Sequence, residues 1–281
     1  MSYPKHDIQA TSDAVVALLT NELRPLHYRE AYLRCAVLNP KLGFYSNKTD
    51  PAEKLRQLFA ETSREIFVCD GFFYLYEWLT ECQDLLFRNT IAADRLTQIQ
   101  RDKCFYDSGR RHDYMVDKYG KANTPHGIEE RQRRALIEYS VKAYFQRQFP
   151  TLFLPPSNEN QFTQWSEDDF RLQFGNTLSA FDVKEFTRTN RTILTSVKQH
   201  ITYIFAVWNY DHADMIGFIR GQDAINLTEL ELSRVNRIVK SVGIDDISNI
   251  ASLLVAVNMY KFGLLFTEVK SEFYRKQSVA A

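Results

Sequence analysis

Asp182, Val183 and Lys184 form an acid–any residue–lysine triplet within a stretch whose apolar residues alternate, as is typical of a β-strand. Because strand residues two apart point to the same face, Asp182 and Lys184 should project together while Val183 packs on the opposite face. Two further acids, Asp168 and Asp169, begin the preceding alternating stretch. Carboxylates gathered at one edge of a hairpin could hold a metal ion.

The turn between the two stretches decides whether these acids meet. Residues Phe170 to Phe174 alternate, Gly175 and Asn176 supply a hairpin turn, and a return strand is expected from Leu178 to Phe186. A two-residue turn would set Asp169 directly opposite Asp182. Like charges facing each other across a strand pair are destabilising unless something such as a bound cation offsets them. A bulge or a different turn would remove the pairing, and the sequence leaves these alternatives open.

Other elements are expected around this hairpin. A helix should run from Ile128 to about Phe149, a buried strand from Ile201 to Trp208, and a short strand from Met215 to Ile219. Thr228 and Glu231 have the spacing of a capping box, which predicts a helix to about Val242. A last helix is expected over residues 247–257.

The first 80 residues have a different pattern. Helical spacing predicts helices over residues 12–23 and 28–38, and Asp50 followed by Pro51 is a strong start signal for a third. Two short apolar runs then flank Asp70 and Gly71, which predicts a β-hairpin. Three helices followed by a hairpin is the layout of a winged helix-turn-helix. Residues 79–123 are interpreted as a largely helical connector.

The helix–hairpin–strand order and the triplet resemble the PD-(D/E)xK nuclease superfamily over residues 129–220. The motif of that family would read Asp169 or Asp168, a short gap, and then Asp182-Val183-Lys184. The proline that often precedes the first acid is missing, so the choice between Asp168 and Asp169 stays open. Glu138 matches the place of a glutamate that the family often carries on the preceding helix.

This resemblance implies a Mg²⁺-dependent deoxyribonuclease of restriction or defence type, with Mn²⁺ as a possible substitute. Mg²⁺ prefers oxygen ligands and keeps several waters, so Asp169, Asp182 and the backbone carbonyl of Val183 would suffice to hold it. Lys184 would orient the attacking water or neutralise the scissile phosphate. Glu138 would hold a metal-bound water or a second ion. Enzymes of this type act on double-stranded DNA and often work as dimers, so a homodimer is expected.

Each of these residues also has an ordinary structural interpretation. An Asp-x-Lys triplet on a strand is often a solvated ion pair, and Asp168 and Asp169 could cap a turn. Glu138 lies on a helix rich in arginine and lysine, where a salt bridge at helical spacing is common. A DNA-binding regulator or adaptor with a degenerate nuclease-like domain is therefore the alternative function.

The N-terminal stretch resembles the HARE-HTH type of winged helix, which is often fused to restriction endonucleases and chromatin regulators. The resemblance rests on the stretch around Pro25 to Tyr28 and on the phenylalanine-rich hairpin, within residues 11–78. It implies DNA contacts by Lys54 and Arg56 on the third helix and by Arg64 before the hairpin. A protein–protein module is the alternative, because this region carries almost no net charge.

Composition sets the outer limits of these expectations. The chain of 281 residues has zero formal net charge, although residues 85–150 carry about +5 and the rest of the C-terminal half about −2. The N-terminus lacks a secretory leader and no apolar run is long enough to span a bilayer, so we expect a cytoplasmic protein of prokaryotic or phage type with no membrane partner. The four cysteines lack zinc-site spacing and are expected to be reduced thiols. P-loop, dinucleotide-binding, nucleophile-elbow and HExxH motifs are missing.

The expected fold class is α+β or α/β. An N-terminal winged helix-turn-helix over residues 1–80 precedes a connector over 81–125. A restriction-endonuclease-like mixed sheet flanked by helices then occupies residues 126–281.

Overall fold

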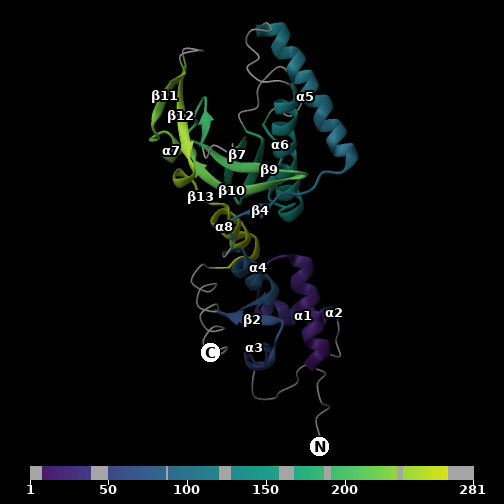
Figure 1. Cartoon of the computed structure of the whole chain (residues 1–281). Coiled ribbons are helices and arrows are strands. Elements are labelled where there is room, and N and C mark those ends of the chain that lie inside the picture. Colours follow the sequence, from purple (N-terminus) through teal and green to yellow (C-terminus); the bar gives the residue numbers. More distant parts are fainter. Residues whose placement is uncertain are drawn as a thin grey trace, which may run out of the picture. The chain divides into compact units, whose positions relative to one another are not determined.

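The computed structural model describes residues 8–38, 50–86, 88–119, 128–157, 168–186, 191–232 and 237–264, and it has the expected mixed α and β composition. The chain forms two compact units. The first contains the described residues up to 86 together with residues 254–264, and the second contains residues 88–253. Figure 1 labels the helices and most of the strands of both units. These boundaries differ from the ones expected from the sequence, because the last helix is shared between the units.

Among its described residues, the first unit contains four helices of its own and a small antiparallel sheet in the order β1-β3-β2. Its elements are α1 (Ile8–Glu22), β1 (Leu26–His27), α2 (Tyr28–Leu38), α3 (Pro51–Thr62), β2 (Ile66–Cys69), β3 (Phe72–Leu75) and α4 (Tyr76–Leu86).

The local signals in this unit act as the sequence predicts. The Asp50 side chain accepts a hydrogen bond of 3.0 Å from the backbone N–H of Ala52, which caps the start of α3. Asp70 and Gly71 both have positive φ, at 48° and 80°, as a two-residue hairpin turn requires. Helix, turn and hairpin bounds therefore agree closely with the expected ones.

The core of the first unit includes side chains from the far end of the chain. The ring of Phe262 stacks on Trp78 with centroids 5.0 Å apart, and Leu264 is also buried in this core. Helix α8 (Ile250–Phe262) begins in the second unit, and its residues from Leu254 onward belong to the first. The first unit is therefore assembled from two distant segments of sequence.

The second unit is built on a seven-stranded mixed sheet in the order β13-β10-β9-β7-β6-β5, with β4 also pairing with β10. Strands β7 and β9 are parallel, whereas the other paired strands are antiparallel. A separate three-stranded sheet has the order β11-β12-β8. The elements are β4 (Ile91–Ala92), α5 (Gln98–Tyr119), α6 (Ile128–Gln148), β5 (Phe153–Leu154), β6 (Phe170–Phe174), β7 (Thr177–Glu185), β8 (Arg191–Leu194), β9 (Ile201–Asn209), β10 (His212–Arg220), α7 (Gly221–Ala224), β11 (Glu229–Leu232), β12 (Arg237–Gly243), a 3₁₀ turn (Ile244–Asp246) and β13 (Ser248–Asn249).

Helix α6 packs against the β6–β7 hairpin and against α5. Its Phe145 ring lies 4.8 Å from Phe170 and 6.2 Å from Phe181, centroid to centroid. Helices α5 and α6 lie side by side (Figure 1), and the Tyr139 hydroxyl donates a hydrogen bond of 2.5 Å to Asp107 on α5. The long helix of the expected connector is thus a packed part of the second unit.

The prediction of a helix after Thr228 was wrong. Among the described residues of this stretch, β11 and β12 form antiparallel strands, with Leu230 paired to Val239. The capping-box spacing of Thr228 and Glu231 competes here with alternating leucines and with the β-branched pair Ile238 and Val239, which favour a pleated strand. Strand β8, which the sequence did not predict, completes this second sheet.

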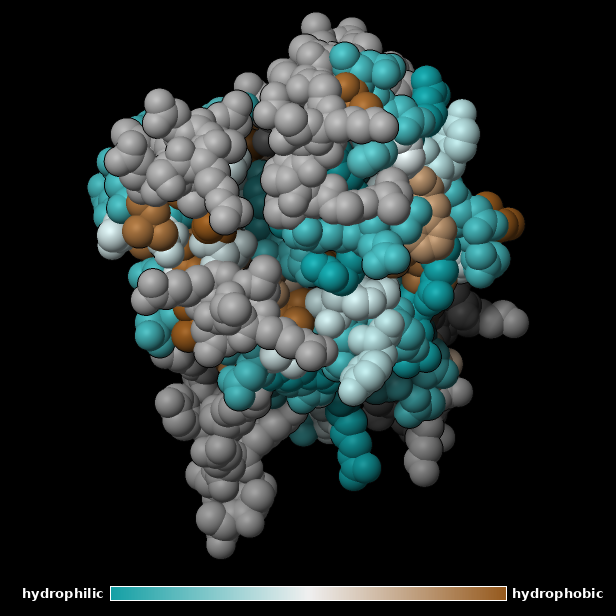
Figure 2. All heavy atoms as spheres, turned by 45° about the horizontal axis from the view of Figure 1, so that its top comes forward, coloured by the Kyte–Doolittle hydropathy of each residue, from teal (hydrophilic) through white to brown (hydrophobic). Residues whose placement is uncertain are grey.

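Figure 2 shows a mostly hydrophilic face with hydrophobic side chains in separate small patches. The most exposed large apolar side chains of the described residues are Tyr210 and Ile99, at 92% and 82% exposure. Scattered exposure of this kind is normal on a protein surface and does not by itself indicate a partner site.

Candidate functional site

The β6–β7 hairpin brings Asp169, Asp182 and Lys184 together. Gly175 has positive φ and Phe174 pairs with Thr177, so the expected two-residue turn is confirmed. The register ends where Phe170 pairs with Phe181, and Asp169 bonds to the same Phe181, so a β-bulge replaces the expected direct pairing of Asp169 with Asp182. The two carboxyls are still neighbours, because the charge of Asp182 raises the pKa of Asp169. The Asp169 backbone N–H donates to the Phe181 carbonyl at 2.7 Å, which holds the two strands together at this point.

Each acid of this pair already has one partner. A carboxylate oxygen of Asp169 accepts a hydrogen bond of 2.7 Å from the backbone N–H of Val183. The Lys184 ammonium group donates to a carboxylate oxygen of Asp182, also at 2.7 Å. Within the described part of the chain, the second oxygen of each carboxylate accepts no hydrogen bond. Two carboxylate oxygens are therefore available at one end of the hairpin.

The neighbouring acid, Asp168, has a structural environment instead. Its side chain is only 4% exposed and accepts hydrogen bonds from the backbone N–H and the hydroxyl of Ser157, at 3.2 and 2.9 Å. The Arg171 guanidinium lies 3.4 Å from its other oxygen. Of the two adjacent acids, Asp169 is thus the one that lies beside Asp182 and Lys184.

The electrostatics of the cluster show an excess of negative charge. Burial, followed by the Asp182 carboxylate, raises the pKa of Asp169 to about 7, against the opposing effects of Lys184, the Val183 N–H and Lys142. Burial acts to lower the pKa of Lys184, but Asp182 and Asp169 outweigh it and the pKa is raised. A cation at this point would be stabilised by both carboxylates.

Glu138 approaches the same cluster from α6. Its carboxylate lies 3.9 Å from the Lys142 ammonium group, and its charge helps to raise the pKa of Lys184. The salt bridge at helical spacing that the sequence suggested is therefore present, and Glu138 also lies within electrostatic reach of the hairpin acids. Lys142, which sequence reasoning treated only as a salt-bridge partner, acts on Asp169 as well.

The backbone of Val183 completes the arrangement. The backbone N–H and C=O of one strand residue point to the same side of the strand. In a hydrogen-bonded antiparallel pair, each residue therefore both donates to and accepts from the residue opposite. The Val183 N–H points to the Asp169 side chain, so its carbonyl also faces that side, where strand β6 has ended. Among the described residues, however, no three His, Cys, Asp or Glu side chains are close enough together to hold a metal ion as a group.

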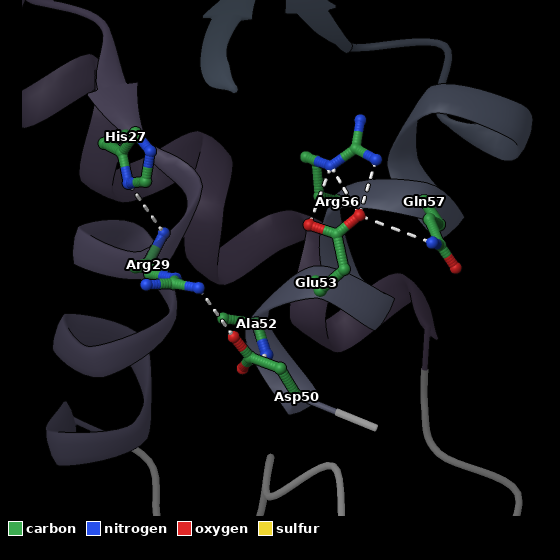
Figure 3. A network of polar contacts seen from close by, with 7 residues as sticks. All are labelled: His27, Arg29, Asp50, Ala52, Glu53, Arg56 and Gln57. Carbon is green, nitrogen blue, oxygen red and sulfur yellow. Dashed lines mark hydrogen bonds and ion pairs between the residues drawn. The ribbon is translucent and has the colours of Figure 1, made fainter. Parts of the chain in front are cut away.

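The residues expected at DNA differ in how available they are. Lys54 on α3 and Arg64 before β2 are exposed. Arg56 is instead held by Glu53, to which its Nε donates at 3.0 Å and its Nη2 at 2.5 Å (Figure 3). Glu53 raises the pKa of Arg56 and is itself kept ionised, so the two charges cancel locally.

Two further residues of this surface were not singled out as binding candidates from the sequence. Arg29 at the start of α2 pairs with the α3 cap residue Asp50 at 3.4 Å, and its backbone N–H donates to the His27 ring (Figure 3). The His27 ring packs beside Tyr28 and Phe72. The surface of α2 and α3 is thus a network of internal ion pairs with few unpaired cations.

Comparison with known proteins identifies no relative: no family model, no curated protein and no solved structure matches the chain. Of the helices in the described ranges, none combines the length and the apolar character needed to cross a membrane.

All four cysteines are free thiols, and burial raises the pKa of Cys82 to about 12.

Proposed function

We propose that the protein is a metal-dependent DNA endonuclease whose site is the end of the β6–β7 hairpin. The observation that carries this proposal is the convergence of Asp169, Asp182 and Lys184, in which one oxygen of each carboxylate accepts no hydrogen bond from the described residues. The order of helix α6, hairpin and parallel strand β9 around them supports a restriction-endonuclease-like interpretation of the second unit.

The donor set suits a hard divalent cation. Mg²⁺ binds through one or two carboxylates and keeps several waters, so the hairpin would supply Asp169, Asp182 and the Val183 carbonyl. When bound, such an ion stabilises the negative charge of phosphodiester cleavage and lowers the pKa of a coordinated water. The raised pKa of Asp169 supports this role, because a cation would offset the repulsion between the two carboxylates.

Lys184 would act on the phosphate side of the reaction. Its side chain is 38% exposed and its ammonium group hydrogen-bonds to Asp182, so it can turn toward a bound phosphate oxygen or attacking water while it stays beside the carboxylates. An ammonium group in this position would neutralise the scissile phosphate and orient the water. This is general positioning and electrostatic catalysis rather than nucleophilic chemistry.

The first unit would bind the double helix. Helices α2 and α3 followed by the β2–β3 hairpin support a winged helix-turn-helix interpretation, with Lys54 and Arg64 as exposed cations toward phosphate. Arg56 would have to leave Glu53 before it could contact DNA. A homodimer, with one site for each strand, remains part of this proposal.

Cleavage of plasmid DNA with Mg²⁺ or Mn²⁺ tests the proposal. We expect the wild type to cut and both Asp182→Ala and Lys184→Ala to lose at least about a hundredfold in rate while still shifting DNA in a gel. Asp117→Ala and Lys103→Ala are matched controls, since both replace exposed side chains of α5. Equal rates in all five proteins would trace the cutting to a contaminant and refute the assignment.

A non-catalytic DNA-binding regulator is the second candidate. It is favoured by the short Lys184–Asp182 ion pair and by the lack, within the described residues, of a three-ligand acidic group. A wild type that shifts DNA but never cuts it, with or without metal, would establish this alternative.

A further inference from the structure

Lys142 lies on the stretch of α6 that runs beside the proposed site. Two contacts fix this stretch: Phe145 packs on Phe170 and Phe181, and Arg133 binds Glu185 at 2.6 Å. The helix therefore runs antiparallel to β7. Its residues between Arg133 and Phe145, which include Glu138 and Lys142, lie alongside the strand segment that carries Asp182 and Lys184.

The Lys142 side chain is held in place from two sides. Its ammonium group lies 3.9 Å from Glu138 and 5.5 Å from the centre of the Tyr139 ring, and its side chain is 23% exposed. Tyr139 is fixed in turn by its hydrogen bond of 2.5 Å to Asp107. The Lys142 ammonium group thus lies over an aromatic ring that is hydrogen-bonded to the neighbouring helix α5. These contacts restrict the side chain more than those of an ordinary surface lysine.

The charges around the hairpin can then be counted. Asp169, Asp182 and Glu138 contribute three negative charges when ionised, and Lys142 and Lys184 contribute two positive ones. These five side chains together carry one net negative charge. A single divalent cation would bring it to one positive charge, which matches a phosphodiester, whereas two such ions would leave an excess of three positive charges in a partly buried site.

We propose that Lys142 takes the place of a second metal ion, so that the site binds one divalent cation per chain and Glu138 serves as the partner of Lys142 rather than as a metal ligand. This inference rests on the proposed nuclease function and specifies the metal requirement of that same site. It assigns Lys142 a role that the Asp-x-Lys motif does not contain.

The binding of Mn²⁺ to the full-length chain tests this inference without relying on activity. Mn²⁺ titrations followed by electron paramagnetic resonance at pH 8 should give one bound ion per wild-type chain. Lys142→Gln removes a positive charge beside the hairpin acids, so it should bind the first Mn²⁺ roughly three- to tenfold more tightly, or bind a second ion. A side chain with a purely structural role would show the opposite effect, since its loss would loosen the site and weaken binding.

Two control variants sharpen the result. Lys142→Arg keeps the charge and should retain one ion with wild-type affinity, and Lys103→Gln removes an exposed lysine of α5 and should change nothing. DNA cleavage by Lys142→Gln should fall at least tenfold even though metal binding is tighter. Tighter metal binding together with slower cleavage is expected if the positive charge of Lys142 stabilises the bound phosphate.

The outcomes separate the two proposals. Two ions bound to the wild type, or weaker Mn²⁺ binding by Lys142→Gln, would overturn the role of Lys142 and leave the nuclease assignment intact. No Mn²⁺ bound by the wild type would overturn both. If Lys142→Gln fails to fold, the number of ions bound by the wild type still decides between one metal and two.

Discussion

Replacing Asp169 by asparagine should make the metal-free protein more stable at alkaline pH. The folded structure disfavours the ionised form of this carboxyl, because it is partly buried beside Asp182, and its pKa is raised to about 7 from an ordinary value of 3.8. An asparagine oxygen could still accept the hydrogen bond from Val183 that the carboxylate now accepts at 2.7 Å. The substitution would therefore remove a charge and keep the geometry.

The magnitude and the pH range follow from this difference in pKa. Because folding raises this pKa, Asp169 does not lower the free energy of unfolding below about pH 4, where the carboxyl is protonated in both states. The free energy of unfolding then falls as the pH rises to about 7, because only the unfolded chain loses this proton readily. The full difference corresponds to about 4 kcal/mol at pH 8, and partial exposure of Asp169 to water should reduce it to roughly 2 to 4 kcal/mol. Asp169→Asn should thus match the wild type near pH 4 and exceed it by that amount at pH 8.

Urea unfolding followed by circular dichroism at several pH values would measure this. Asp168→Asn is the matched control, because Asp168 lies 3.4 Å from Arg171 and accepts two hydrogen bonds from Ser157. Its replacement should destabilise the protein at pH 8, opposite in sign to the change at Asp169. An Asp169→Asn protein no more stable than wild type at pH 8, or a difference independent of pH, would refute the electrostatic description of the site.

Three other predictions address the metal and the fold. Mn²⁺ must displace the proton of Asp169, so its apparent affinity should rise by about tenfold per pH unit up to about pH 7 and then level off, as titrations across this range would show. Gly221→Ala would bring a Cβ within 1.9 Å of a backbone carbonyl oxygen, so it should lower the free energy of unfolding by roughly 3 kcal/mol or more in thermal melts. Gly109→Ala is the control, because Gly109 lies in open space on α5 and its replacement should be neutral or slightly stabilising. Phe262→Ala should lower the free energy of unfolding by about 3 to 5 kcal/mol, because a buried ring that stacks on Trp78 is lost. A near-ultraviolet circular dichroism spectrum that does not change would contradict the packing of Phe262 on Trp78.

Local signals in the sequence were sufficient for much of the fold. Asp50 caps α3, and the pairs Asp70-Gly71 and Gly175-Asn176 form the two turns that the sequence predicts. Because each of these features depends on a few adjacent residues, it can be recognised without knowledge of tertiary contacts. The two-residue turn after Phe174 also sets the register of the hairpin as far as Phe170 and Phe181, the residues next to Asp169 and Asp182.

Features that depend on distant residues were not predictable in the same way. Thr228 and Glu231 have the spacing of a helix start, but pairing of β11 with β12, and of β12 with β8, overrides it. Nothing near Lys142 in sequence shows that it acts on Asp169, since that effect arises only when α6 packs on the hairpin. The sequence likewise carries no local sign that Phe262 packs on Trp78.

The shared core of the first unit has a consequence for how the protein is made. Phe262 follows Trp78 by about 180 residues. At the usual speed of translation, roughly 10 to 40 seconds separate the synthesis of these two rings. During that interval part of the apolar core of the first unit is exposed to solvent, because Phe262 and Leu264 have not yet been synthesised. The strands of the second unit are already present by then. The first unit would therefore complete its core only after the sheet of the second unit has been synthesised.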